Sequence, residues 1–280
     1  MLAASEASDA SLEREWPDMA VKQSNKDILL TRIAEKRLDQ ALLFWLQPII
    51  DVPSQRCCGA EVLVRGCIDG ELIFPDAFIP ELEANGDICH IGVYMLEQGL
   101  RYAKSQRLDQ HPWFTMSFNF SPIEMNTVDI SEKIKMITDM VQYPCSSIII
   151  EITETETLLT PLGRTNADKL KQMNFCLAWD DIKSVSDLNK NDDCFTAHVV
   201  KIDRSLFLDN QLVMLRDIIT LCRKHGWPII AEGIEEAWQH AWLVEELVQY
   251  CQGYYFSRPI PPERFTQQYL PLRVRIYHNK

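Results

Sequence analysis

The sequence predicts an α/β protein whose strands close into a (β/α)8 barrel, and three observations support this fold class. Eight short apolar segments alternate with longer amphipathic segments along the 280 residues. Alternating strands and helices are typical of parallel β/α architecture, and eight strands are enough to close a barrel. The glycine-rich motifs GxGxxG and GxxxxGK[ST], which often follow the first strand of an open doubly wound sheet, do not occur. The open sheet is therefore the alternative with less support.

The apolar segments differ from the helical ones in length and in the spacing of their large side chains. The first, LLFWLQPIIDV, is continuously apolar, as expected of a buried strand, whereas SSIII and PIIA are short and β-branched. Helical segments instead repeat apolar residues every three or four positions. Strands are expected at residues 42–52, 59–64, 114–118, 147–150, 175–179, 197–200, 228–231 and 250–256. Helices are expected at residues 78–83, 90–104, 130–141, 165–173, 212–225 and 237–246.

The N-terminal part of the chain is expected to precede the barrel. Residues 1 to about 25 are polar and aperiodic, which is typical of a loose tail. Between residues 26 and 43, apolar residues recur at helical spacing and predict an amphipathic helix. The chain is therefore divided into a polar tail with a lead-in helix, residues 1–38, and a barrel domain, residues 39–280.

Composition narrows the function classes. With 28 Lys+Arg against 40 Asp+Glu, the net charge is −12, which argues against DNA and other broad nucleic-acid binding. No apolar stretch approaches the roughly 18 residues of a membrane span, and the N-terminus lacks the pattern of a secretory signal. Nine cysteines without repeated spacing disfavour a disulfide framework or a zinc site. A cytoplasmic protein with reduced thiols is expected.

Polar side chains recur at nearly every expected strand end. In a β/α barrel these ends converge on one mouth, where active sites lie. At any single position, the polar residue could simply mark the point where the strand ends. That explanation does not account for the repeated occurrence of carboxylates and amides at these positions. The residues concerned are Glu61, Arg65, Asn119, Glu151, Asp180, Asp181, Lys201, Asp203, Glu232 and Gln252.

Several carboxylates in one pocket require a counter-charge, because like charges raise one another's pKa. Oxygen ligands from Asp, Glu and Asn suit hard divalent cations such as Mg²⁺ or Mn²⁺, and no pair of the six histidines lies at these strand ends. Carboxylate-rich centres with two metals are typical of phosphoryl hydrolysis. The residues alone therefore predict a metal-dependent phosphodiesterase or phosphomonoesterase.

The same residues carry a family resemblance. Over residues 40 to about 265, the sequence resembles the EAL-domain family of bacterial cyclic di-GMP phosphodiesterases. The matching blocks are QPI at 47–49, EVL at 61–63 followed by Arg65, FIPELE at 78–83, SFNFS around Asn119, EITE at 151–154, DD at 180–181, KIDRS at 201–205, AEGIEE at 231–236 and QGYYFSRP at 252–259. The resemblance implies a modified TIM-type barrel whose first strand runs antiparallel. It also implies hydrolysis of cyclic di-GMP to linear pGpG with two Mg²⁺ or Mn²⁺ ions, and a homodimer.

The resemblance implies a role for each site residue. Asp180 would bridge the two metals, Lys201 would orient the water, and Glu232 would serve as general base or as a metal-linked acid. Glu154 is similar to the Glu that anchors the loop after the two aspartates. The implied metal ligands are Glu61, Asn119, Glu151, Asp180, Asp181 and Glu232. The implied catalytic set is Lys201, Glu232, Gln252 and Glu61. The implied substrate contacts are Gln47, Leu63, Arg65, Asp203 and Glu235.

Two departures from the family pattern bear on activity. Val62 replaces the signature alanine and is expected to crowd its strand slightly. Active members usually read DDFGTGYSS, whereas this chain reads DDIKSVSDL from residue 180, without the glycines that permit positive φ. The alternative is therefore a catalytically weak or inactive module that acts as a cyclic di-GMP receptor, or that binds a protein partner through the N-terminal tail or the altered loop. The complete set of polar residues favours the enzyme.

Overall fold

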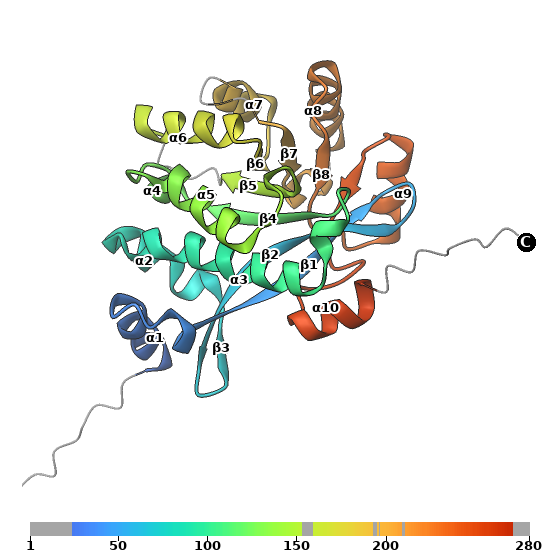
Figure 1. Ribbon diagram of the computed structural model, residues 1–280. Helices are drawn as coiled ribbons and strands as arrows, with labels where there is room; N and C mark the ends of the chain where they lie inside the picture. Colours follow the sequence, from blue (N-terminus) through green and yellow to red (C-terminus); the bar gives the residue numbers. More distant parts are fainter. Residues whose placement is uncertain (1–23, 153–158, 193–194, 196, 209–210, 271–280) are drawn as a thin grey trace, which may run out of the picture.

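The computed structural model describes residues 24–152, 159–192, 195, 197–208 and 211–270 (Figure 1). Within these residues, eight strands pair in a closed ring in the order β1–β9–β8–β7–β6–β5–β4–β2, and β2 pairs again with β1. The barrel that the sequence predicts is therefore confirmed. The strands of the ring are β1 (Leu42–Asp51), β2 (Arg56–Ile68), β4 (Thr115–Phe120), β5 (Ile148–Ile152), β6 (Cys176–Ile182), β7 (Val199–Ile202), β8 (Ile229–Ala231) and β9 (Tyr250–Cys251).

Strand β1 runs antiparallel to both of its neighbours, β2 and β9, while the other pairs of the ring are parallel. This confirms the antiparallel first strand that the resemblance implies. A further strand, β3 (Glu71–Ile73), pairs with the end of β2 as a hairpin. The two connecting residues, Asp69 and Gly70, have φ of 51° and 81°, which is the geometry of a tight hairpin turn. The sequence pattern did not predict β3.

Figure 1 shows the helices lying around the outside of the strands. They are α1 (Asn25–Ala34), α2 (Ile79–Asn85), α3 (Ile91–Ser105), α4 (Pro122–Met125), α5 (Ile130–Val141), α6 (Pro161–Gln172), α7 (Val185–Asp192), α8 (Leu212–His225), α9 (Ala237–Glu245) and α10 (Pro262–Tyr269). Short 3₁₀ turns are η1 (Leu38–Gln40), η2 (Pro75–Ala77), η3 (Asp87–His90), η4 (Leu108–Gln110), η5 (Cys145–Ser147) and η6 (Arg204–Phe207). Helices α4, α7 and α10 were not among the predicted elements.

The lead-in helix is shorter than predicted. It begins at the capping box formed by Ser24 and Asp27, and it ends at Ala34 instead of continuing to residue 43. Lys36 has a φ of 60°, which a helix does not tolerate, and from Leu42 the chain is already paired in β1. The helix nevertheless packs on the barrel, because Gly66 of β2 leaves room for Leu29. A Cβ at Gly66 would lie 2.6 Å from Cδ2 of Leu29.

The last strand is also shorter than predicted, ending at Cys251 instead of residue 256. After Gln252 the chain turns, and the N–H groups of Phe256 and Ser257 both donate to the carbonyl of Gly253. Gly253 packs directly on the turn that follows β8, since a Cβ on Gly253 would lie 2.2 Å from the backbone N and O of Ile234. The aromatic run that suggested a strand therefore belongs to a turn at the mouth of the barrel.

The described residues bear on two expectations from the sequence, the lack of a disulfide framework and the lack of a membrane span. All eight cysteines outside the undescribed segments are free thiols, in agreement with the predicted lack of a disulfide framework. In the described part of the chain, no helix combines the length and the apolar character needed to cross a membrane.

Candidate active site

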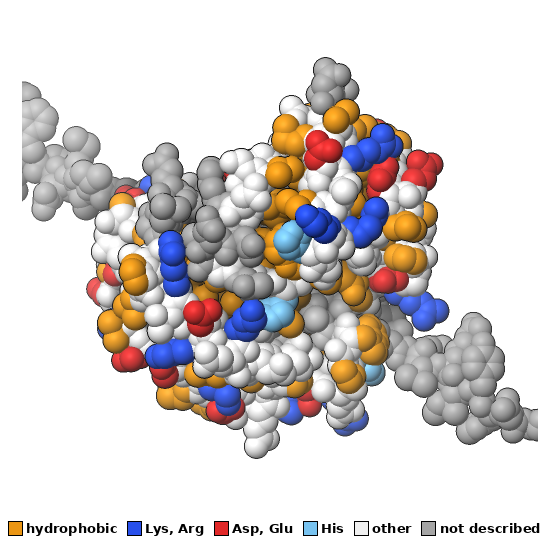
Figure 2. All heavy atoms as spheres, turned by 90° about the horizontal axis from the view of Figure 1, so that it is seen from above, with side chains coloured by type: hydrophobic (Ala, Val, Ile, Leu, Met, Phe, Trp, Pro, Cys, Tyr) orange, Lys and Arg blue, Asp and Glu red, His pale blue; other side chains and the backbone are white. Residues whose placement is uncertain are grey.

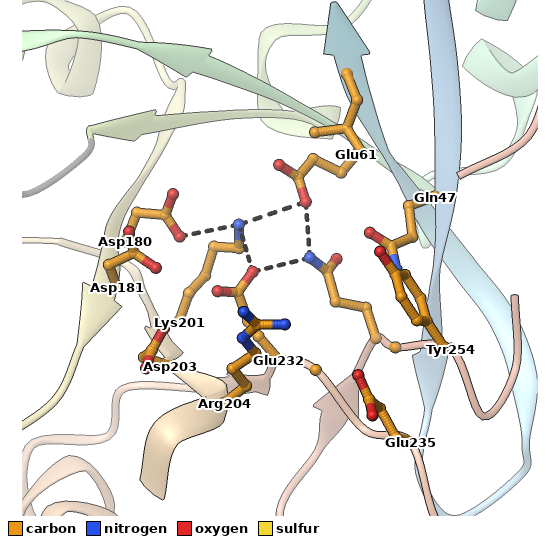
Figure 3. A pocket seen from close by; sticks show the side chains of 14 residues that line it. Gln47, Glu61, Asp180, Asp181, Lys201, Asp203, Arg204, Glu232, Glu235 and Tyr254 are labelled. Atoms are coloured by element: carbon orange, nitrogen blue, oxygen red, sulfur yellow. Dashed lines mark hydrogen bonds and ion pairs between the residues drawn. The ribbon is translucent and has the colours of Figure 1, made fainter. Parts of the chain in front are cut away.

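A pocket of about 320 Å³ opens at the end of the barrel where the polar residues of the strands lie (Figure 3). Its floor and walls come from β1, β2, β6 and β7 and from the turns that follow β7, β8 and β9. Most of the lining side chains carry a charge. The lining residues are Gln47, Glu61, Leu63, Asp180, Asp181, Lys201, Asp203, Arg204, Glu232, Gly233, Glu235, Gln252, Gly253 and Tyr254.

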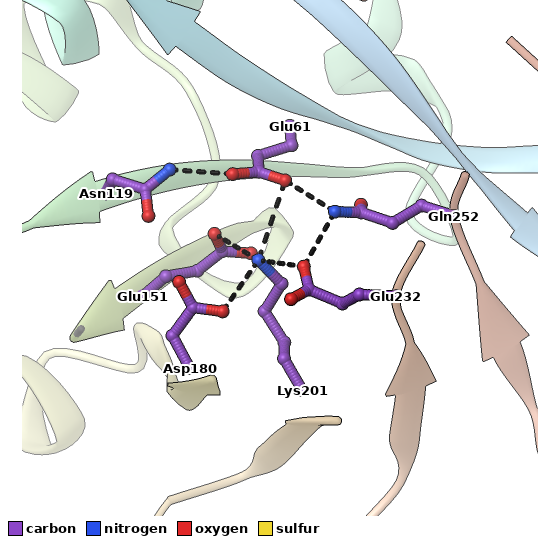
Figure 4. Close-up of polar contacts among 7 residues, drawn as sticks. All are labelled: Glu61, Asn119, Glu151, Asp180, Lys201, Glu232 and Gln252. Carbon is purple, nitrogen blue, oxygen red and sulfur yellow. Dashed lines mark hydrogen bonds and ion pairs between the residues drawn. The ribbon is translucent and has the colours of Figure 1, made fainter. Parts of the chain in front are cut away.

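Lys201 lies at the centre of the site, surrounded by four carboxylates (Figure 4). Its Nζ is 2.8 Å from Oε1 of Glu232, 2.9 Å from Oε2 of Glu151 and 2.9 Å from Oδ1 of Asp180. Oε2 of Glu61 is slightly farther, at 3.5 Å. Only 1% of the Lys201 side chain is exposed, so this cation is shielded from water and its contacts are with the four carboxylates.

The backbone register explains why residues distant in sequence meet here. Asn119 of β4 pairs directly with Glu151 of β5 in the parallel sheet. Because side chains alternate faces along a strand, each position that points into the barrel brings its polar group to the same interior. Each of the four carboxylates around Lys201 lies on a different strand or strand end.

Two amide side chains donate hydrogen bonds to carboxylates of the cluster. The Nδ2 of Asn119 donates to Oε1 of Glu61 at 2.7 Å. The Nε2 of Gln252 donates both to Oε2 of Glu61 at 2.7 Å and to Oε1 of Glu232 at 2.8 Å. Gln252 therefore bridges the carboxylates of β2 and of the turn after β8 and fixes their separation.

Burial and neighbouring charges shift the pKa values of Lys201, Glu151, Glu232 and Glu61. For Lys201, burial lowers the pKa, but the surrounding carboxylates, Asp180 and Glu151 foremost, outweigh it and hold the pKa well above its usual value. Burial raises the pKa of Glu151 far above its usual value, although the charge of Lys201 opposes the shift. Burial also raises the pKa of Glu232, to about 8. Burial acts in the same direction on Glu61, but Lys201, Gln252 and Asn119 overcome it and lower that pKa.

The donor set fits divalent cations. Ligand oxygens of Asp180, Asp181 and Glu232 all lie within 4.8 Å of one another. Oε1 of Glu151 and Oε1 of Gln252 are buried and accept no hydrogen bond from the described residues, which is costly unless another partner takes them up. Anionic and amide oxygens are the ligands that Mg²⁺ and Mn²⁺ prefer. The acidic cluster is therefore chemically suited to such ions.

The altered segment after Asp181 does not carry the backbone strain that its lost glycines suggested. Within the described residues, Ile182, Lys183 and Val185 are all outside the positive-φ region, and Asp181 itself has a φ of 55°. The pairing of β6 with β7 shifts register at this point, between Trp179 and Ile182. The positive φ therefore occurs at Asp181, one residue before Ile182. Aspartate adopts the left-handed region more readily than a β-branched residue does.

Beyond Ile182 the chain enters helix α7 through short-range hydrogen bonds. The N–H of Asp187 donates to Oγ of Ser184 at 3.2 Å, and the N–H of Lys183 donates to Oδ2 of Asp187 at 3.2 Å. Glu154, the predicted anchor of this segment, lies outside the described residues. Its role as the anchor of this segment therefore stays a prediction.

Val62 is accommodated on the outer face of β2. A Cβ on Gly99 of α3 would lie 3.0 Å from Cγ2 of Val62, so the missing side chain of that glycine provides the room. The valine is 3% exposed and belongs to the core between strand and helix. Its extra methyl groups thus point away from the pocket.

The predicted substrate contacts fall into two groups. Four of them line the pocket, namely Gln47, Leu63, Asp203 and Glu235. Arg65 does not line it. Its guanidinium lies over the rings of Trp45 and Phe74, at 5.3 and 5.4 Å from the ring centres, and donates to the carbonyl of Val64.

Sequence reasoning did not single out Arg204, Gly233 and Tyr254, which also line the pocket. All three lie inside the blocks KIDRS, AEGIEE and QGYYFSRP that carry the family resemblance. Their position beside recognised motif residues is the sequence signal that could have identified them as pocket residues. Tyr254 is held from outside by Arg258, whose guanidinium lies 4.2 Å from the ring centre.

Comparisons with known proteins agree with this geometry. The family model described as EAL domain matches residues 31–259. The chain is 30% identical over 255 residues to the signaling protein YkoW of Bacillus subtilis strain 168, covering 87% of this chain and 31% of YkoW. It is 26% identical over 234 residues to the cyclic di-GMP phosphodiesterase PdeL of Escherichia coli K12, covering 81% of this chain and 64% of PdeL. The chain thus spans about a third of the length of YkoW.

Solved structures show the same fold. The EAL domain protein from Listeria monocytogenes EGD-e superposes with a TM-score of 0.70 at 26% identity, covering 90% of this chain and 99% of that one. A structure described as the PaMucR phosphodiesterase in complex with c-di-GMP has a TM-score of 0.75 at 24% identity, with coverages of 85% and 99%. The EAL enzyme Bd1971, in its form bound to cAMP and cyclic di-GMP, has a TM-score of 0.78 at 21% identity, covering 87% of this chain and 68% of that one.

Proposed function

The chain belongs to the EAL-domain family, and from this premise we propose that it is a metal-dependent phosphodiesterase that hydrolyses cyclic di-GMP to linear pGpG in bacterial second-messenger signalling. The observation that carries the proposal is the complete polar cluster around Lys201 at the mouth of the barrel. Buried carboxylates are costly to hold together, so a chain without catalytic duty has no reason to keep all of them.

We propose that two Mg²⁺ or Mn²⁺ ions are the cofactors. The residues that would hold them are Glu61, Asn119, Glu151, Asp180, Asp181 and Glu232. When bound, such ions polarise a phosphodiester and lower the pKa of water, which is the chemistry that this reaction requires. The buried oxygen of Glu151 that accepts no hydrogen bond from the described residues supports this assignment.

Glu232 is proposed as the general base. Lys201 and Gln252 both contact its Oε1, at 2.8 Å each, and among the described residues no contact engages Oε2. The two donors therefore fix the carboxylate while leaving one oxygen for the proton of the attacking water. Burial raises the pKa of this carboxyl to about 8 in the metal-free chain, so a neighbouring cation would be needed to keep it ionised as a base near neutral pH.

Lys201 is proposed to hold the negative charges of the site in place. Because its pKa is well above the usual value, it stays protonated at neutral pH. Its position between Glu151 and Asp180 keeps the two carboxylates together at short range. Gln47, Leu63, Arg65, Asp203 and Glu235 remain the proposed substrate contacts, and a homodimer remains part of the proposal.

The proposal is tested by incubating the purified chain with cyclic di-GMP and Mg²⁺ or Mn²⁺ and separating the products by chromatography. We expect pGpG with the native chain, and none after EDTA treatment or in Glu61→Ala. Glu97→Ala, which removes a half-buried glutamate of α3 that does not line the pocket, is the matched control and is expected to match the native rate. If neither metal supports product formation, the enzyme is excluded, and calorimetric titration with cyclic di-GMP then tests the receptor alternative.

A further inference from the structure

The pocket is strongly acidic, and few positive charges offset it. Of its lining residues, only Lys201 and Arg204 are basic. Lys201 is buried and already contacts four carboxylates, so it has little capacity left for an incoming anion. The acidic lining residues are Glu61, Asp180, Asp181, Asp203, Glu232 and Glu235. A ligand with two phosphates meets repulsion here unless a further cation takes part.

Arg204 is anchored at the rim of the pocket by its backbone. It begins the turn η6 directly after β7, and the preceding Asp203 accepts a hydrogen bond from the N–H of Ser205 at 2.9 Å. The N–H of Asp203 in turn donates to the carbonyl of Ile182 at 3.1 Å. The start of the Arg204 side chain therefore has a fixed position, although the side chain itself is exposed.

Gly233 directs the Arg204 side chain along the pocket wall. A Cβ on Gly233 would lie 2.3 Å from Cβ of Arg204 and 3.1 Å from its Cδ, so the arginine stem packs on bare backbone. Gly233 also has a φ of 62°, a conformation that favours glycine. Figure 3 shows the guanidinium rising from its turn toward the acidic cluster. Arg204 forms no ion pair with any carboxylate of the described residues, which leaves its donors available.

We propose that Arg204 binds the phosphate of cyclic di-GMP that is not hydrolysed, and thereby selects a cyclic dinucleotide over a simple phosphodiester. This inference rests on the proposed function. The reacting phosphate must lie against the buried cluster, because the proposed base Glu232 and metal ligands are there. The second phosphate of the same ring then lies nearer the rim, where the arginine is. The planar guanidinium offers paired donors that match two phosphate oxygens.

The test compares two substrates and three variants. Steady-state kinetics are measured for cyclic di-GMP and for bis(p-nitrophenyl) phosphate, a diester with a single phosphate, in Arg204→Ala, Arg204→Lys and Arg101→Ala. In Arg204→Ala we expect the KM for cyclic di-GMP to rise about tenfold, the loss typical of one hydrogen bond to a charged group. The ratio of kcat/KM for cyclic di-GMP to that for the simple diester should fall by about the same factor.

Two variants calibrate the result. Arg204→Lys keeps the charge without the paired donors and should fall between the native chain and Arg204→Ala. Arg101→Ala removes an exposed arginine of α3 that pairs with Glu97, so it changes the net charge equally and should behave as the native chain. An unchanged substrate ratio in Arg204→Ala overturns the proposal, because Arg204 would then serve the reacting phosphate or the fold.

A binding measurement separates this inference from the proposed function. Cyclic di-GMP is titrated calorimetrically into Glu232→Gln and into Glu232→Gln/Arg204→Ala in Mg²⁺, where the missing base prevents turnover. We expect about tenfold weaker binding in the double variant, even if the native chain proves inactive. Equal dissociation constants overturn the role of Arg204, whereas the proposed function is tested separately, by pGpG formation in the native chain.

Discussion

The buried cluster around Lys201 and the segment after Asp181 adjoin one another, yet they are held together in different ways. The cluster joins residues that are distant in sequence: Gln252 and Glu61 are 191 positions apart, and Lys201 and Glu151 are 50 apart. The segment is held by hydrogen bonds between residues three or four positions apart, from Lys183 to Asp187.

This difference explains how the two regions diverged from the family pattern unequally. Lys201, Glu61, Glu232 and Gln252 each contact two or more other members of the cluster, so replacing one of them leaves several polar groups without partners. The segment after Asp181 is stabilised by hydrogen bonds among its own residues. Ser184 caps the start of α7, and this conformation does not require glycine. The chain can therefore keep the polar cluster although its segment reads DDIKSVSDL, in place of the DDFGTGYSS that the family resemblance leads one to expect.

The most severe way to break the cluster is Lys201→Met, which leaves four neighbouring carboxylates without their cation. We expect the free energy of unfolding to fall by about 3 kcal/mol in EDTA, and activity to fall at least a thousandfold. Urea denaturation and product chromatography measure the two effects. Lys169→Met, which removes an exposed pair with Glu132, should leave the free energy of unfolding close to that of the native chain. Equal losses in the two variants would contradict the central role of Lys201.

Gln252→Ala should have the next largest effect, because it removes both hydrogen bonds that bridge Glu61 and Glu232. We expect a loss of about 2 kcal/mol in the free energy of unfolding, since both acceptors are carboxylates. Gln249→Ala is the matched control. Gln249 accepts one hydrogen bond, from the uncharged N–H of Ile229, and its loss should cost about 1 kcal/mol. A smaller loss at Gln252 than at Gln249 would count against the bridge.

The pH dependence of stability tests the electrostatics of the cluster in metal-free protein. Burial raises the pKa of Glu232 from 4.5 in the unfolded chain to about 8, so the folded protein binds this proton more tightly. The associated stability is fully present below pH 4.5 and is lost as the pH rises through 8. Between pH 6 and pH 9, the native chain should lose about 2–3 kcal/mol more than Glu232→Gln in urea titrations. Parallel losses in both proteins would show that Glu232 is already ionised at pH 6.

The smallest effect is expected in the segment itself. Ser184→Ala removes the hydroxyl that accepts the N–H of Asp187 and should lower the free energy of unfolding by about 0.5–1 kcal/mol. Because this contact is local, kcat/KM for cyclic di-GMP should stay within about twofold of the native value. A loss of activity comparable to that of Gln252→Ala would show that the segment, and not only the cluster, determines turnover.

The sequence predicted the barrel and most of its site because both depend on patterns that repeat. Apolar runs mark the strands, and a polar residue at each strand end marks the mouth, so Glu61, Glu151 and Glu232 could be identified without a structure. The antiparallel first strand came only from the family resemblance, since LLFWLQPIIDV has the same apolar pattern in either direction.

Other features required three-dimensional contacts. The central position of Lys201 among four carboxylates depends on how the ring closes, which no local pattern encodes. The lead-in helix ends early because Lys36 adopts a positive φ and Leu42 joins β1. The positive φ at Asp181 and the course of Arg204 over Gly233 likewise follow from neighbouring backbone, not from residue type alone.

The most direct test of the two-metal site is the number of Mn²⁺ ions that the chain binds, measured by equilibrium dialysis with electron paramagnetic resonance of the free ion. This readout does not depend on turnover. The native chain should bind two ions, Asp181→Asn should retain one, and Glu61→Ala should lose tight binding. If the native chain binds no Mn²⁺ more tightly than Glu61→Ala does, the carboxylates around Lys201 are an ion-pair cluster and not a metal centre.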